Sequence, residues 1–438
     1  MSLVDEHGCP HSTDNADALA VWERALDLFQ TFNEDPYPHV DAALEADADF
    51  IMGHCFHAAG NLMATDGRNR PKVAERLETL NGLAPRANDR ERGHIAALNA
   101  WYRGDWPGTQ ACYDHVLAAY PRDTYALHAA HFVDFLLGDT RQMRDRIARV
   151  LPFWDAGVPG FSFITGMDAF VLEEDGDYPR AEERGIYAWE TDNRDAWAVH
   201  AVAHVYEMEG RLHDGMDWMN RTWDHWKDGV FAVHNTWHTT LLHVEAGDYA
   251  EALSLYDSAM FQPKDDYVSD MRDCAALLWR LTLFEVDVTS RWDELLPYWQ
   301  DRVDDSVFAF SDMHAMMTLA ACGDEQGQAD LLLKLEAVAK GKDSNAFATR
   351  AVGLPVCRGI QAFAQKRYGD AIAALVPVRY STQVMGGSHA QRDVIGLTLL
   401  EAALAAGDRS TAQALTAERF ARKPASPLNR AYMARSGL

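Results

Sequence analysis

Apolar side chains recur along the chain with the periodicity of helices. In residues 196–209 and again in 212–226 they fall at i, i+3, i+4 and i+7, on either side of Gly210. This spacing predicts a pair of amphipathic helices. The links between such pairs, for example residues 191–195, are short and polar, as expected where one helix ends and the next begins. No strand-like alternation competes, so the pattern predicts an all-α fold.

A short glycine turn repeats along the chain, at Gly104, Gly138, Gly176, Gly210, Gly247, Gly323 and Gly407. The first five glycines are separated by 34, 38, 34 and 37 residues, and the 76 residues from Gly247 to Gly323 leave room for one more turn near Glu285. A further turn without glycine fits at Lys366. Glycine after a helix takes the left-handed conformation without steric cost.

This repetition predicts an α-solenoid of antiparallel helix pairs with a period of about 37 residues, strongly curved or closed. We expect residues 49–438 to form the solenoid as one structural unit. Residues 1–48 are expected to form an N-terminal helical extension. The first turn is assigned to Gly67, and residues 1–17 are read as a flexible polar terminus.

Four segments carry a more specific resemblance: residues 200–207, 235–238, 277–280 and 387–393. Residues 192–211 resemble the linker, first helix and turn of a tetratricopeptide repeat. The four segments are similar to the tetratricopeptide repeat protein 38 family, and the similarity extends along nearly the full chain from Asp49. The resemblance implies a closed or strongly curved helical-repeat fold. It implies no reaction, and it transfers no catalytic residues.

The charge and composition of the chain exclude several classes of binding partner. Aspartate and glutamate outnumber lysine and arginine 66 to 40, for a net charge of -26. Such a chain repels phosphate backbones and anionic lipids, so neither nucleic acid nor a membrane is an expected partner. No apolar window approaches ~18 residues and no leader is evident, which indicates a cytoplasmic protein. Neither a dinucleotide fingerprint nor a phosphate loop occurs, and no organic cofactor is expected.

Ten of the eighteen histidines fall on one face of the predicted first helices, when each is counted back from its own turn. They are His54, His57, His94, His128, His131, His200, His204, His234, His238 and His314. Because steps of three, four and seven residues keep side chains on one helical face, these imidazoles are expected to line the concave surface. The face combines histidine with tryptophan and carboxylates, which favours a pocket for a small ligand over a peptide groove.

The densest part of this face supplies the candidate catalytic residues His200, His204, Glu207, His234, His238, Asp312 and His314. Histidines with near-neutral pKa, positioned by Glu207, are suited to general acid and base chemistry. Alternatively, His200 with His204 and His234 with His238 can converge on a divalent cation. Ala201 and Asn235 stand where a zinc hydrolase motif needs glutamate, which favours the metal-free interpretation.

The candidate ligand-binding residues are His54, His57, Asn235, Trp237, Trp279, Arg280, His389, Arg392 and Asp393. Two glycines before a helix start, with His389 and Arg392, are suited to holding an anion. Ser388 and Gln391 form a capping box, so this serine has a structural role. Asp270 and Asp273 open a helix, where they serve either the helix dipole or a site.

These observations predict a pocket for a small polar, anionic ligand. The chemistry expected there is that of a cofactor-independent acid-base enzyme, a hydrolase or lyase. The alternative is a scaffold that binds a peptide or a partner protein in an open concave groove. The sequence does not determine the oligomeric state.

Overall fold

The computed structural model describes residues 3–261 and 267–438, and the all-α prediction is confirmed. The strands of the described part are β1 (Leu3–Val4) and β2 (Pro10–His11), which pair antiparallel. No helix in the described ranges is both long and apolar enough to cross a membrane. The chain divides into two compact units: unit 1 is Met1–Ala201 with Asp228–Phe231, and unit 2 is Val202–Lys227 with Ala232–Leu438.

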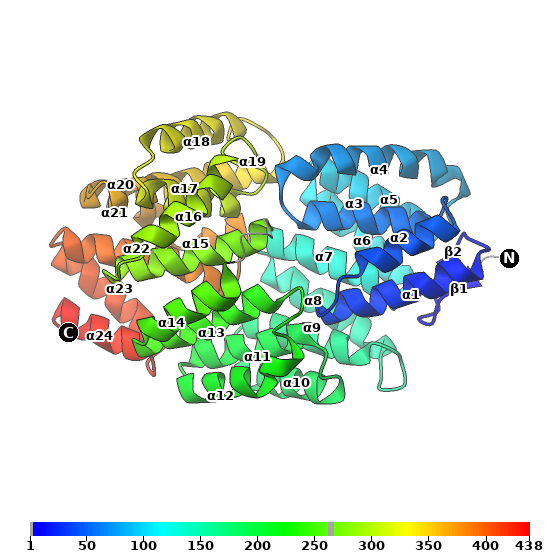
Figure 1. Ribbon diagram of the computed structural model, residues 1–438, viewed down its shortest axis with the longest axis horizontal. Coiled ribbons are helices and arrows are strands. Elements are labelled where there is room, and N and C mark those ends of the chain that lie inside the picture. The colour runs from blue at the N-terminus through cyan, green and yellow to red at the C-terminus, as the bar shows by residue number, and fades with distance from the viewer. Residues whose placement is uncertain (1–2, 262–266) are drawn as a thin grey trace. The chain divides into compact units, whose positions relative to one another are not determined.

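Unit 1 consists of helices that are joined by short turns and pack against their neighbours in sequence (Figure 1). They are α1 (Ala16–Thr31), α2 (Tyr37–Ala46), α3 (Ile51–Met63), α4 (Arg70–Leu83), α5 (Asp89–Tyr102), α6 (Trp106–Ala119), α7 (Thr124–Leu137), α8 (Thr140–Val150), α9 (Phe161–Glu174) and α10 (Tyr178–Thr191). Helix α11 (Ala196–Glu209) begins in unit 1 and continues without a break into unit 2.

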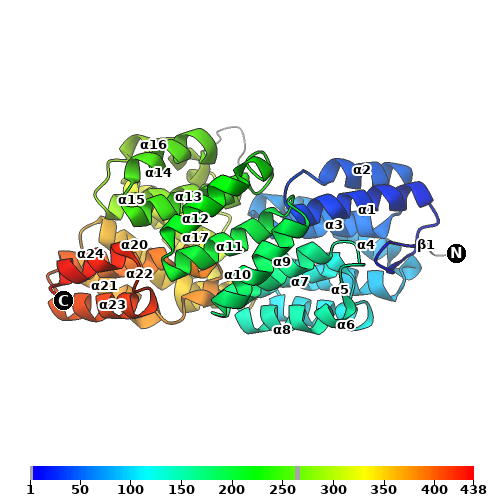
Figure 2. The ribbon, with the colours of Figure 1, turned by 90° about the horizontal axis from the view of Figure 1, so that it is seen from below.

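Unit 2 continues this arrangement with a second set of helices. They are α12 (Leu212–Thr222), α13 (Ala232–Ala246), α14 (Tyr249–Leu255), α15 (Val268–Leu283), α16 (Thr289–Gln300), α17 (Ala309–Ala321), α18 (Glu325–Val338), α19 (Ser344–Ala348), α20 (Leu354–Ala364), α21 (Tyr368–Leu375), α22 (His389–Ala405), α23 (Arg409–Arg422) and α24 (Pro427–Ser436). Both views show α20 beside α21 and α22 beside α23 (Figures 1 and 2).

Helix α15 lies in the interior of unit 2, where it packs against α13, α17 and α22. Two buried polar contacts join it to α22. The indole Nε1 of Trp279 donates to Thr398 Oγ1 at 2.9 Å, and Arg280 Nη2 donates to the Ala390 carbonyl at 2.6 Å. These bonds satisfy donors that would otherwise be costly to bury. Residues more than a hundred positions apart are therefore fixed beside each other.

Each turn between paired helices contains one residue in the left-handed conformation. Glycine holds this position at Gly104, Gly138, Gly176, Gly210, Gly247, Gly323 and Gly407. At each of them the next residue donates its backbone N–H to the carbonyl five positions earlier, as Asp248 does to His243 at 2.8 Å. This bond closes the first helix. In five of these turns the aspartate that follows glycine then caps the second helix, as Asp248 Oδ1 does by accepting from the Glu251 N–H.

Four turns between paired helices of the described chain lack glycine at this position, and Phe32 holds it after α1 with φ of 52°. Glu285 and Lys366 adopt the left-handed conformation themselves, with φ of 61° and 58°, where the sequence predicts turns without glycine. The assignment of the first turn to Gly67 is wrong, because Thr65 takes the left-handed position with φ of 51° while Gly67 begins a short 3-10 helix. The hydrogen-bonding pattern of the turn therefore determines its position more strongly than glycine does.

The N-terminal segment differs from the expected flexible terminus, which is wrong for the described residues. His11 is fully buried in unit 1, and its Nε2 lies 3.0 Å from Asp5 Oδ2. The Arg90 guanidinium donates to the Pro10 carbonyl at 3.0 Å. The segment is fixed because its polar groups find buried partners, which its local sequence does not reveal. Helix α1 packs on α3 through Trp22 and Phe56, whose ring centroids lie 5.9 Å apart. The division of the chain into an extension of residues 1–48 and a solenoid of residues 49–438 stays a prediction.

Prediction: Gly247→Ala should destabilise the protein by about 1 kcal/mol, because an alanine in the left-handed conformation is strained. A Cβ at Gly247, where φ is 79°, would meet nothing within 4 Å, so the strain of the backbone is the whole effect. Gly369→Ala is the matched control, since Gly369 lies inside α21 at negative φ with equally open space. That change should stabilise by up to about 1 kcal/mol. Thermal unfolding measures both, and equal shifts would contradict the turn mechanism.

Candidate active site in unit 2

Two imidazoles on α13 are each oriented by a carboxylate from another helix. His234 Nδ1 lies 2.7 Å from Asp273 Oδ2, on α15. His238 Nδ1 lies 3.3 Å from Glu207 Oε2, on α11. A carboxylate at Nδ1 fixes the orientation of the ring and favours the tautomer that carries its proton on Nδ1. Both dyads therefore have the histidine–carboxylate arrangement that suits proton transfer.

The dyads lie beside each other and close to a third imidazole. The ring centroids of His234 and His238 are 4.9 Å apart, and those of His204 and His238 are 4.3 Å apart. Trp237 stacks on His234 with centroids 5.5 Å apart and planes 18° from parallel. His204, Trp237 and His238 are each at most 1% exposed. His204 and His238 are therefore buried, whereas the His234 side chain is 15% exposed.

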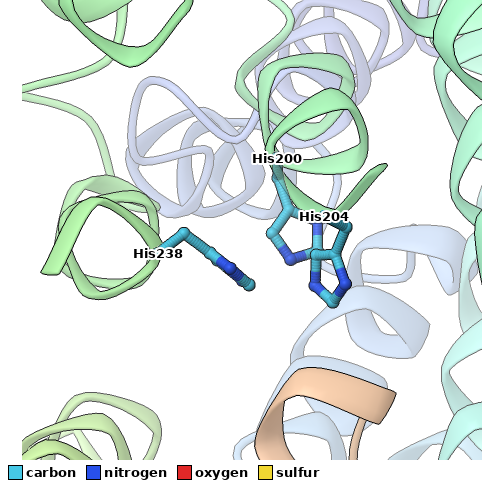
Figure 3. Close-up of side chains that lie close together, drawn as sticks. All are labelled: His200, His204 and His238. Atoms are coloured by element: carbon cyan, nitrogen blue, oxygen red, sulfur yellow. The ribbon is translucent and has the colours of Figure 1, made fainter. Parts of the chain in front are cut away.

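His200 extends this cluster along α11. Because α11 is one unbroken helix, His200 lies one turn before His204. One ring nitrogen from each of His200, His204 and His238 lies within 4.8 Å of the other two. Figure 3 shows the three side chains, two from α11 and one from α13. Zinc binds imidazole nitrogen at about 2.0–2.1 Å, so ligand nitrogens on one ion lie about 3–4 Å apart. The structure thus brings three of the four predicted histidines close to the geometry of a metal site, while His234 binds Asp273 instead.

Burial changes the acidity of the carboxyl groups near the dyads. Burial raises the pKa of Glu207, and Lys423, His204 and Arg280 partly offset the effect. For Asp270, burial and then repulsion by Asp273 raise the pKa to about 6. Glu207 and Asp270 therefore hold their protons closer to neutral pH than ordinary carboxyls do, which is the condition for acid-base work.

Two arginines on α15 add positive charge to the same interior. Arg272 Nη1 donates to Ser311 Oγ at 3.2 Å, and the Arg280 guanidinium carbon lies 5.5 Å from the centroid of the Trp237 ring. Burial lowers the pKa of Arg272 to about 10, although Asp273 and Asp270 oppose it. Burial lowers the pKa of Arg280 as well. For both arginines, burial outweighs the opposing effect of the nearby carboxylates on the pKa.

His314 and Asp312 are both predicted catalytic residues, and the structure gives them different partners. His314 Nδ1 donates to the Phe310 carbonyl at 2.8 Å, and burial, with Arg272 and Arg280, lowers its pKa to about 3. A neutral ring of this kind accepts hydrogen bonds but does not act as an acid near pH 7. Asp312 instead accepts a hydrogen bond from Ser306 Oγ at 3.1 Å, and the charges of Asp305 and Lys334 affect its pKa. Residues that are two positions apart on a helix are rotated by about 200° from each other, so the side chains of Asp312 and His314 leave α17 on opposite faces.

Several predicted ligand-binding residues have structural partners. His54 and His57 lie on α3 in unit 1, where His54 Nε2 donates to the Ala48 carbonyl at 2.9 Å and His57 Nε2 lies 2.8 Å from Asp41 Oδ1. Neither is among the unit 2 dyads. Asn235 is fully buried on α13, beside the cluster. Trp279 and Arg280 hold α15 to α22, as described above.

At the predicted anion site before α22, Arg392 and Asp393 already have hydrogen-bond partners within the protein. The capping box of Ser388 and Gln391 is confirmed. Arg392 Nη1 donates to the Gly387 carbonyl, and Asp393 forms a two-bond ion pair with Arg419. That pair contributes to holding the pKa of Asp393 at about 2. His389 is half-buried at the first position of α22.

Of the two interpretations of Asp273, a helix-dipole residue or a site residue, its contact with His234 favours the second. Asp273 lies twelve residues before Glu285, and His234 lies thirteen before Gly247. Similar depth in neighbouring first helices is therefore the signal that pairs them. Read alone, Asp273 resembles an ordinary acidic residue of a first helical turn. Arg272 carried no such signal.

No family model matches this chain. The resemblance to the tetratricopeptide repeat protein 38 family therefore stays a prediction.

Prediction: Asp312→Asn should stabilise the protein at pH 8 and have little effect near pH 4. Burial raises the pKa of Asp312 to about 7 from an ordinary 3.8, so the folded protein keeps a proton that the unfolded chain has lost. Its contribution to stability is complete below about pH 4 and is lost as pH rises through 7. Asparagine avoids this loss, which amounts to at most about 4 kcal/mol. Tm measured from pH 4 to 8 checks the prediction, and a constant difference between variant and parent would contradict it.

Proposed function

We propose that unit 2 is an acid-base enzyme of the hydrolase or lyase type that acts on a small polar, anionic molecule. The observation that carries the proposal is the pair of carboxylate-oriented imidazoles on α13, 4.9 Å apart. His234, held by Asp273, takes a proton from the substrate or from water. His238, held by Glu207, returns a proton to the leaving group. Two neighbouring groups with different surroundings provide the acid and the base of one reaction.

The buried arginines support the choice of an anionic ligand. Burial lowers the pKa of Arg272, and Arg280 donates to backbone carbonyls on α15 and α22. A carboxylate or phosphate group near these guanidinium groups would stabilise their charged forms. Burial and the charges of both arginines lower the pKa of His314, and the neutral imidazole can accept a hydrogen bond from a protonated ligand group. The alternative, a groove for a peptide, fits less well, because extended peptides bind to exposed side chains, and His200, His204 and His238 are buried.

A metal-dependent form of the enzyme is the second candidate. The close ring nitrogens of His200, His204 and His238 favour it. Imidazole ligands suit zinc and related divalent ions, and such an ion would supply an activated water when bound. Glu207 would then orient His238 as a second carboxylate–histidine partner does in metal sites. His234 and Asp273 keep the proton-transfer role in both forms.

The finer description of the fold belongs to the same proposal. The left-handed turns and the packing of α13, α15 and α17 support a tetratricopeptide-like solenoid with a period of about 37 residues. Contacts of α24 with α13 support a strongly curved path within unit 2. The net charge of -26 supports the cytoplasmic location and disfavours nucleic acid and membranes as partners.

Prediction: His234→Gln and Asp273→Asn should each lower kcat/KM by ~10² to 10⁴, the usual effect of a lost or misoriented general base. Turnover is first sought with a panel of small phosphate monoesters, carboxylic esters and hydroxy acids. His243→Gln is the matched control, because His243 is on the same helix but binds the turn residue Asp248. It should keep full activity and an unchanged Tm. Full activity in the His234 variant would eliminate the dyad from the mechanism.

Prediction: if the metal-dependent form is right, the purified chain should bind one Zn²⁺ or Co²⁺ tightly. His204→Gln and His238→Gln should each weaken that binding at least tenfold, because each removes one of three ligands. His243→Gln again serves as the control for adventitious imidazoles. Metal per chain after gel filtration and the visible absorption of the Co²⁺ form give the result. Binding that is absent, or equal in all variants, would leave the metal-free enzyme as the proposal.

A further inference from the structure

Unit 1 contains a separate polar pocket of about 410 Å³. Its walls come from the N-terminal segment, one face of α1 and the loops that precede α9 and α11. The residues on α1 are Glu23, Arg24, Asp27 and Gln30, of which Glu23, Asp27 and Gln30 follow at i, i+4 and i+7 on one face. The pocket has no residue in common with the proposed active site.

Gln30 offers this pocket a buried acceptor that lacks a donor. Its side chain is 5% exposed, and its Nε2 donates to the Leu26 carbonyl at 3.2 Å. That bond fixes the orientation of the amide, so Oε1 is the free end. Oε1 has no hydrogen-bond partner among the described residues. Since a buried acceptor without a donor costs about 1–3 kcal/mol, the geometry calls for a ligand that donates.

Gly160 keeps the space beside Gln30 open. It is left-handed, with φ of 77°, and a Cβ there would lie 2.9 Å from Gln30 Oε1 and 3.7 Å from His7 Nε2. His7 Nε2 already donates to the Pro159 carbonyl at 3.1 Å. The neighbouring imidazole nitrogen is therefore committed to the wall and does not satisfy Gln30.

The charges of the pocket leave an excess of carboxylates. Arg194 binds both Asp27 and Asp192 through paired hydrogen bonds, and Arg24 donates to Asp27 at 2.6 Å. These two arginines and two aspartates balance one another. The carboxylates of Glu6 and Glu23 have no arginine partner in the pocket.

Glu6 and Glu23 are held close together by the backbone. The Glu6 N–H donates to Glu23 Oε1 at 2.8 Å. Burial raises the pKa of the Glu6 carboxyl, His7 lowers it, and repulsion by Glu23 and Asp27 raises it again. A positive ligand would relieve this repulsion, whereas an anion would increase it. The apolar surfaces of Phe163 and Pro159 complete the lining and suit a short alkyl chain.

We propose that this pocket binds a primary alkylammonium group, which donates to Gln30 Oε1 and pairs with Glu23 and Glu6. The ammonium has three donors and one charge, which matches one neutral acceptor and two carboxylates. The group belongs either to a free aliphatic amine or to a lysine side chain of another protein. The inference does not rest on the proposed activity of unit 2.

The test is calorimetric titration of the full chain with 1,4-diaminobutane and, separately, with Nα-acetyl-lysine methylamide at moderate salt. We expect saturable binding of at least one, with one site per chain. Butan-1-ol and acetate should not bind. If only the free diamine binds, the ligand is a free amine, and if the lysine derivative binds as well or better, it is a lysine side chain.

Two variants locate the binding. Glu23→Gln and Gln30→Leu should each weaken amine binding at least tenfold, and having two variants guards against one that fails to fold. Glu78→Gln is the control for net charge, because Glu78 is an exposed carboxylate on α4 outside the pocket. It should change the affinity less than twofold. No saturable binding, or an equal loss in the Glu78 variant, would overturn the proposal.

Discussion

The left-handed residue at each helix-pair turn is the constraint on which the rest of this structure depends. It lets the residue that follows it donate to the carbonyl five positions before that residue, which ends the first helix, and in five turns the aspartate at that position caps the next helix. The chain therefore reverses within a few residues each time. Where glycine is absent, as at Glu285 and Lys366, the bonds still impose the conformation. The strain this costs is offset by closing one helix and starting another.

The reversal determines which side chains meet. It sets α13 against α15 and α15 against α17, so residues at similar depth in successive first helices become neighbours. His234 and Asp273 are such a pair, 2.7 Å apart. His238 and Glu207 lie at different depths, nine and three residues before their turns, and their contact is the longer one, at 3.3 Å. The arrangement thus builds dyads across helices without any motif within one helix.

Buried charge then gives the two units different chemical characters. In unit 2, burial lowers the pKa of two arginines on α15, and the pKa of His314 is lowered as well. In the pocket of unit 1 the arginines are paired with aspartates, and the excess is of carboxylates and one buried amide oxygen. Our proposals therefore assign an anionic ligand to one unit and a cationic ligand to the other. Net charge alone does not predict either.

By itself, the sequence determined the helices, the turns at Glu285 and Lys366 and the capping box of Ser388, because these depend on periodicity and on hydrogen bonds between residues close in the chain. It also identified the histidines of α11 and α13. Only the tertiary structure decided that Asp312 faces away from His314, that His54 serves a neighbouring loop, and that the N-terminal segment is buried. The hydrogen-bond partners and the burial of these side chains come from packing between residues that are distant in sequence. Helical spacing determines on which face of a helix a residue lies, but not which other element packs against that face.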